Sequence, residues 1–122
     1  MSLFDQKDYE RFLGKEAGVT FVDQWESRVA KVGGKVFTLL TTGMRDDIPR
    51  IVFKVAEETF EILTSMEGIA QAPYFAKRQW VSVAQHADLP EHDLKTYVMR
   101  SYRTVAKGLT KKLRTELGIE ID

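Results

Sequence analysis

The chain has 122 residues, 43% of them hydrophobic and 30% charged, and its basic and acidic side chains balance to a formal charge of zero. This length and composition are typical of a globular soluble protein, so we expect one domain over residues 1–122. The absence of cysteine excludes disulfides and thiolate metal sites. No apolar run approaches the ~20 residues that span a bilayer, and the acidic N-terminus is unlike a signal peptide. We therefore expect a cytoplasmic protein without membrane contact.

Residues 3–17 have the periodicity of an amphipathic helix that Ser2 or Asp5 can cap and Gly18 can end. Its apolar positions follow the i, i+3, i+4 spacing: Tyr9, Phe12 and Leu13.

From Thr20 the apolar period changes to two, which predicts an extended segment with Phe21 and Trp25 on one side. Two β-rich runs then flank Gly33-Gly34, and this pair predicts a hairpin because glycine adopts positive φ without a Cβ clash. Pairing across a two-residue loop would place four side chains on one face: Ala30, Val32, Phe37 and Leu39.

After a polar loop over residues 43–49, a strand is expected at residues 50–55. Its inward positions are Ile51, Phe53 and Val55. Glu57 then opens a second helix that ends near Ser65, and residues 79–84 form another strand.

The longest helix begins near Pro90 and is two-sided. Its apolar sector contains Leu94, Tyr97, Val98, Ser101 and Val105, and the opposite side contains Arg100, Arg103 and Lys107. Gly108 ends this helix, and Thr110 can cap a short last helix.

This order of elements predicts an α+β fold of two layers. Short connections between consecutive strands favour an antiparallel sheet. We expect an N-terminal helix, one mid-chain helix and the C-terminal helices to pack on it. The aromatic residues expected in the core are Trp25, Phe37, Phe53, Phe60 and Tyr97.

The sequence offers no catalytic or metal-binding constellation. His86 and His92 have no spacing that fits a closed tetrahedral metal site. No nucleophile-elbow motif occurs, and Ser101 is expected to bond to its own helix backbone. We expect no enzymatic activity, no metal and no cofactor.

Four short motifs resemble the MmcQ/YjbR family over roughly residues 15–114. They are VGGKVF at 32–37, FKV at 53–55, APYFAKRQWV at 72–81, and Ser101-Tyr102 followed by Val105 and Leu109. Of the Pro-Trp-Gly-like segment usual before the first hairpin, only Trp25 is present. The resemblance implies a compact α+β domain similar to the secretion-chaperone-like fold, and a DNA-binding role without established catalytic residues.

Charge is distributed unevenly, since residues 95–114 contain basic but no acidic side chains. A one-signed face can attract a polyanion even on a neutral molecule, although the pI of 6.7 is below the ~9 typical of dedicated nucleic-acid domains. DNA is therefore the candidate partner of a protein expected to be monomeric. The candidate contacts are Lys35, Lys54, Lys77, Arg78, Trp80, Arg100, Arg103, Lys107, Lys111, Lys112 and Arg114.

Three functions stay open at this point. In the first, about six of these cations contact phosphates, which predicts a slope of log K against log salt of about −5. The second is a protein-interaction or chaperone-like module with an exposed apolar patch. The third is a pocket for a small anionic ligand near Lys77, Arg78 and Trp80.

Overall fold

Within the described part of the chain, the sheet has six strands in the order β1-β2-β3-β4-β6-β5, and each neighbouring pair is antiparallel. A computed structural model describes residues 1–41 and 47–120, so most of the predicted loop at 43–49 lies outside the described residues. The strands are β1 (Val19–Gln24), β2 (Ser27–Val32), β3 (Lys35–Thr41), β4 (Arg50–Lys54), β5 (Ile69–Gln71) and β6 (Trp80–Ala84).

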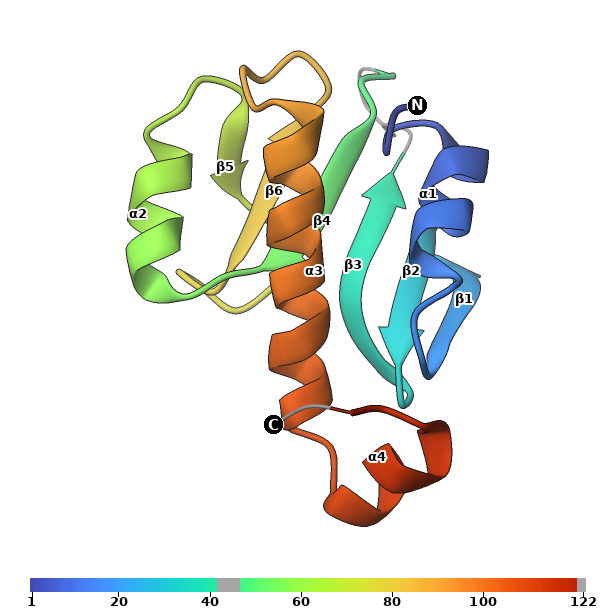
Figure 1. The fold of residues 1–122 in the computed structure, drawn as a ribbon. Coiled ribbons are helices and arrows are strands. Elements are labelled where there is room, and N and C mark those ends of the chain that lie inside the picture. Colours follow the sequence, from blue (N-terminus) through green and yellow to red (C-terminus); the bar gives the residue numbers. More distant parts are fainter. Residues whose placement is uncertain (42–46, 121–122) are drawn as a thin grey trace.

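The helices α1, α2 and α3 lie on one face of the sheet, and α4 follows α3 at one end of the molecule (Figure 1). The long helix α3 crosses the middle of the sheet. This arrangement confirms the predicted two-layer α+β fold. The helices are α1 (Gln6–Leu13), α2 (Glu57–Thr64), α3 (Glu91–Lys107) and α4 (Lys111–Leu117).

The helix α1 is shorter at both ends than the predicted helix over residues 3–17. The Asp5 carboxylate accepts a hydrogen bond from the backbone N–H of Asp8 and caps the start of α1. Of the two predicted caps, Ser2 and Asp5, the second is therefore confirmed. The C-cap of α1 is Gly14 rather than Gly18. The apolar stripe is confirmed where it matters for packing, because Tyr9 and Leu13 are buried.

The main core lies between the helices and the sheet. Its strand residues include Ala30, Val32, Phe37 and Leu40, with Ile51 and Phe53 from β4 as predicted. The prediction for Leu39 was wrong, because β3 contains a bulge: Ala30 pairs with Thr38 and the next residue of β2 pairs with Val36. The extra residue, Phe37, shifts the alternation and turns Leu39 to the other face of the sheet.

A smaller apolar cluster covers that other face. It comprises the buried residues Val29, Leu39, Val52, Ala72 and Trp80, against which Phe75 packs with its ring centroid 4.5 Å from that of Trp80. The cluster contains no helix residue, which agrees with all three large helices lying on the opposite face.

The prediction for Trp25 was also wrong. Strand β1 ends at Gln24, and Trp25 and Glu26 form a two-residue turn with φ of 52° and 56°. A turn of this kind suits the twist of a hairpin but normally uses glycine or asparagine, because other residues are strained at positive φ. Consequently the indole of Trp25 is 61% exposed instead of buried.

Ser101 connects α3 to the sheet at the point where the pairing of β3 with β4 stops. Its hydroxyl donates to the carbonyl oxygen of Phe37 at 2.6 Å and accepts from the backbone N–H of Lys54 at 3.0 Å. The expectation that Ser101 bonds to its own helix was therefore wrong. A small hydroxyl in the apolar sector of α3 instead bridges two strand groups that lie just beyond the last β3–β4 pair, that of Thr38 with Phe53.

Candidate anion-binding site

A cavity of about 320 Å³ lies between the end of β4, the start of α2 and the C-terminal half of α3. We call it the basic groove. Its lining residues are Lys54, Val55, Ala56, Thr59, Tyr97, Arg100, Arg103, Thr104 and Lys107.

The groove collects four cations from two parts of the chain. Lys54 is the last residue of β4, and the other three cations come from α3. Within the described residues, none of the side chains that line the groove is a carboxylate. The tertiary structure thus unites Lys54 with Arg100, Arg103 and Lys107, all four of which the sequence proposed as candidates.

The aromatic side of the groove orients one of these cations. The ring of Tyr97 stacks on Phe53 at 6.2 Å between centroids and 11° between planes. The guanidinium of Arg100 lies 5.4 Å from the centroid of the same Tyr97 ring. This cation–π contact limits the freedom of Arg100 without neutralising its charge, which keeps the charge available to an anion.

The start of α2 also lies at the groove, and Glu57 and Glu58 in its first turn partly offset the positive end of its dipole. Ala56 is the N-cap of α2, and no side chain caps this helix. The first N–H groups of a helix have no partner within the helix, and they carry the positive end of its dipole. Thr59 contributes a hydroxyl to the same lining, whereas the hydroxyl of Thr104 already donates to the carbonyl oxygen of Arg100 at 2.9 Å. The groove therefore offers positive charge and the hydroxyl of Thr59 beside the start of a helix, a combination suited to phosphate oxygens.

Arg78 is paired with carboxylates and is therefore less available to bind an anion. Its guanidinium forms ion pairs with both Glu57 and Glu61 of α2. The hydrogen bonds to Glu61 and then Glu57 raise its pKa, so Arg78 stays charged but is compensated locally. Carboxylates from outside the basic segment thus lie among the predicted cations at this corner.

The remaining candidates are dispersed. Trp80 is buried in the cluster on the other face of the sheet, so its ring offers no surface for stacking. Lys77 and Lys35 are exposed, the first in the loop between β5 and β6 and the second after the Gly33-Gly34 hairpin. The other three lie on α4: Lys111, Lys112 and Arg114.

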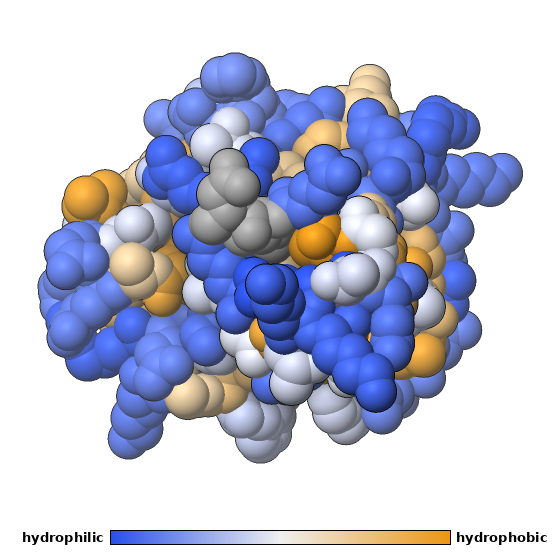
Figure 2. Space-filling view, turned by 60° about the horizontal axis from the view of Figure 1, so that its bottom comes forward, coloured by the Kyte–Doolittle hydropathy of each residue, from blue (hydrophilic) through white to orange (hydrophobic). Residues whose placement is uncertain are grey.

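The end of the molecule that carries α4 is largely hydrophilic. Figure 2 looks towards this end and shows apolar residues only as small, separate patches. The large exposed apolar side chains among the described residues lie on different elements: Met1, Trp25, Ile62 and Tyr74. This distribution gives little support to a chaperone-like apolar surface.

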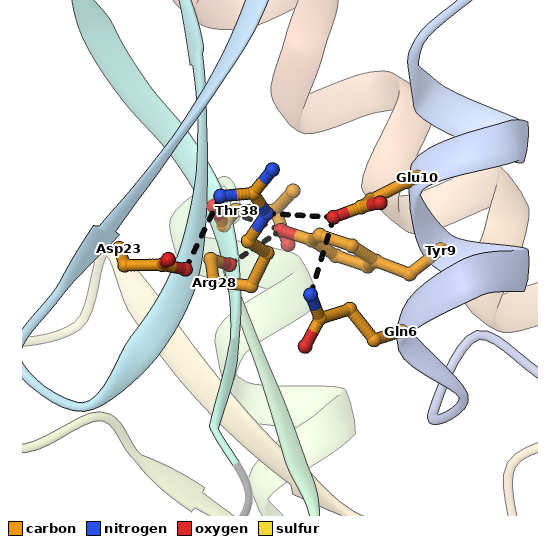
Figure 3. Close-up of polar contacts among 6 residues, drawn as sticks. All are labelled: Gln6, Tyr9, Glu10, Asp23, Arg28 and Thr38. Carbon is orange, nitrogen blue, oxygen red and sulfur yellow. Dashed lines mark hydrogen bonds and ion pairs between the residues drawn. The ribbon is translucent and has the colours of Figure 1, made fainter.

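A second hollow of about 280 Å³ lies beside the β1–β2 turn and is lined in part by Asp23, Trp25, Glu26 and Arg28. Its cation is already paired: Arg28 contacts Glu10 at 2.7 Å and Asp23 at 3.2 Å (Figure 3). Burial opposes the charge of Arg28, but these two hydrogen bonds raise its pKa. The hollow carries mixed charge and is a poorer anion site than the basic groove.

Among the described residues, no group of three or more histidine, cysteine or carboxylate side chains could hold a metal ion. In the same part of the chain, no helix combines the length and apolar character needed to cross a membrane.

The sequence prediction did not assign five of the lining residues to a site: Val55, Ala56, Thr59, Tyr97 and Thr104. Tyr97 was assigned to the core alone, and Thr59 and Thr104 were not singled out. A signal for two of them was present, since Tyr97, Arg100, Thr104 and Lys107 follow the three-to-four spacing of one helical stripe.

The fold and the groove together define a small α+β protein with a six-stranded antiparallel sheet, helices on one face and a cationic cavity beside α3. The YjbR family matches residues 14–104, and the chain belongs to this family. The resemblance found in the sequence motifs is thereby confirmed.

Two solved structures are similar. The crystal structure of the Deinococcus radiodurans protein DR2400, with domain DUF419, has a TM-score of 0.82 at 26% identity, covering 94% of this chain and 88% of that chain. A Pseudomonas syringae protein has a TM-score of 0.65 at 19% identity, covering 80% of this chain and 95% of that chain, and shows the fold alone. No curated protein matches the chain.

Proposed function

We propose that this protein binds the phosphate backbone of nucleic acid, DNA in the first place, through the basic groove. The observation that carries the proposal is the convergence of Lys54 with Arg100, Arg103 and Lys107 on one cavity, which no acidic side chain lines among the residues that the structure describes. Such contacts position a nucleic acid without reading its bases. The proposed role is binding rather than catalysis.

The number of cations in the groove changes the expected salt dependence of binding. The basic groove supplies four cations, whereas the sequence alone suggested about six phosphate contacts. Four contacts predict a slope of log K against log salt of about −3.6 for duplex DNA and about −2.8 for a single strand. Arg78 is left out of this number because Glu57 and Glu61 compensate it.

Fluorescence anisotropy tests the proposal with a labelled DNA hairpin that carries a single-stranded tail and so offers both forms. The affinity should fall between ~50 and 200 mM salt with a slope in the range above. The double substitution Arg103→Glu, Lys107→Glu should abolish measurable binding, because it reverses two exposed cations of the groove.

The matched control is Lys111→Glu, Lys112→Glu, which changes the net charge equally but lies on α4 outside the groove. It should weaken binding only slightly. The proposal fails if the hairpin does not bind at the lowest salt, or if the α4 control weakens binding as much as the groove variant.

The cavity itself favours a second candidate, a small anionic ligand. The volume of about 320 Å³ and the uncapped start of α2 suit a phosphate-bearing molecule of modest size. This position differs from the predicted one near Lys77 and Arg78. Titration with pyrophosphate separates the two functions: saturable binding that excludes the hairpin, together with a salt slope near −1 for the hairpin, would favour the small ligand.

The cytoplasmic location and the monomeric state stay predictions. Size-exclusion chromatography with light scattering would test the second, and an apparent mass of twice 14.0 kDa would contradict it.

A further inference from the structure

The loop that joins β5 to β6, residues 72–79, is held rigidly at its base. The side-chain amide of Gln71 donates to the carbonyl oxygen of Ala72 at 2.8 Å, and its oxygen accepts from the backbone N–H of Arg78 at 2.9 Å. One side chain thereby bridges the two ends of the loop.

Two further contacts anchor the loop to the rest of the fold. Phe75 packs against Trp80 in the cluster on the far face of the sheet, and the ion pairs of Arg78 attach the loop to α2. Because these anchors come from three directions, the loop has a defined shape and does not depend on a partner for it.

Within this fixed loop, the side chain of Tyr74 is 100% exposed and its backbone has a φ of 69°. Positive φ is strained for a tyrosine, and glycine or asparagine would fit the position better. A fully exposed ring also adds nothing to the core. The fold therefore holds an aromatic ring in solvent at some expense to stability, which is a feature of binding surfaces.

The loop adjoins the basic groove. Lys54, which lines the groove, pairs directly with Trp80 at the end of the loop, and the N–H of Val55 donates to the carbonyl oxygen of Gln79 at 2.8 Å. Figure 1 shows the β5–β6 connection beside the start of α2, at the same end of the sheet. Lys77 is an exposed cation of this loop, next to Arg78, whose charge Glu57 and Glu61 compensate.

We propose that the nucleic acid bound by this protein is single-stranded, with an unpaired base stacked on Tyr74 while the phosphates lie in the basic groove. In a duplex the faces of the bases are already stacked on each other, so only an unpaired base can use an exposed ring. An exposed aromatic ring beside a groove of cations is the combination that single-strand binding without sequence preference requires. This inference rests on the proposed function.

The test compares a labelled oligothymidine, the corresponding oligouridine and a mixed-sequence duplex of the same length. Tyr74→Ala should weaken binding of both single strands about tenfold, the effect of losing one base–aromatic stack, and should leave duplex binding unchanged. Tyr74→Phe should retain the wild-type affinity, because the ring remains. The salt slope should not change in either variant, since tyrosine neutralises no phosphate.

Trp25→Ala is the matched control, since it also removes an exposed aromatic side chain held at positive φ, but at the opposite end of the sheet and outside the groove. It should have no effect on binding. Whichever of DNA or RNA binds more tightly identifies the source of the strand, and either supports the proposal.

The outcomes separate this inference from the function on which it rests. If Arg103→Glu, Lys107→Glu abolishes binding but Tyr74→Ala has no effect, the groove binds nucleic acid and the stacking role is wrong. Equal affinity of the wild type for the duplex and the single strands would also overturn the single-strand preference. If no nucleic acid binds at all, both proposals fall.

Discussion

Ser101 provides the sharpest test of how this fold is held together. Its hydroxyl bridges the carbonyl oxygen of Phe37 and the N–H of Lys54, and the side chain is fully buried between α3 and the sheet. Substitution with alanine removes one oxygen atom and creates almost no cavity. The expected loss of stability therefore comes from the two backbone groups that lose their partner.

An unsatisfied buried polar group costs about 1–3 kcal/mol. Two such groups, with some relaxation of the bulge, lead us to expect that Ser101→Ala lowers the free energy of unfolding by about 2–4 kcal/mol. Because Lys54 also lines the basic groove, the same substitution should weaken nucleic-acid binding, although Ser101 itself is buried and does not line the groove.

The assay is urea unfolding followed by far-UV circular dichroism, with Thr104→Ala as the matched control. Thr104 lies on the exposed side of the same helix, and its hydroxyl donates at 2.9 Å to the carbonyl oxygen of Arg100, four residues earlier. Its loss should change stability by no more than about 0.5 kcal/mol. If Ser101→Ala is no more destabilising than this control, the two strand groups do not depend on Ser101 and the reasoning is wrong.

Two further predictions concern Tyr9 and the hairpin glycines. Burial raises the pKa of the Tyr9 phenol well above its usual value of about 10, so the folded state holds this proton more tightly than the unfolded state. Its contribution to stability is complete below pH ~10 and should be lost above it by up to about 1.4 kcal/mol per pH unit. Alkaline unfolding should show a shallower decline in Tyr9→Phe, whereas Tyr74→Phe should match the wild type. Gly33→Ala should destabilise more than Gly34→Ala: both positions have positive φ, but a Cβ at Gly33 would lie 2.6 Å from Leu109, and at Gly34 it meets nothing within 4 Å. Equal thermal midpoints for these two variants would contradict the importance of the Leu109 contact.

The sequence alone was sufficient for the order of elements and the class of fold. Apolar periodicity located the helices and most strands, because burial of one face imposes that period on any helix or strand. Local caps were also predictable, as Asp5 and Thr110 show, since a cap depends on residues within one turn. The family resemblance followed from short motifs whose order along the chain is visible in the sequence.

Tertiary structure decided what local patterns cannot specify. The bulge at Phe37 turned Leu39 to the opposite face, and the strained turn exposed Trp25, because the alternation within one strand does not specify its register against the neighbouring strand. The tertiary structure also decided which charged side chains lie close together. Residues 54 and 107 are far apart in the chain, yet packing of α3 on β4 brings their cations together, while carboxylates of α2 compensate Arg78. The sequence determined which charges the protein has, and the fold determined which of them are free to act together, because Coulomb interactions depend on separation in space.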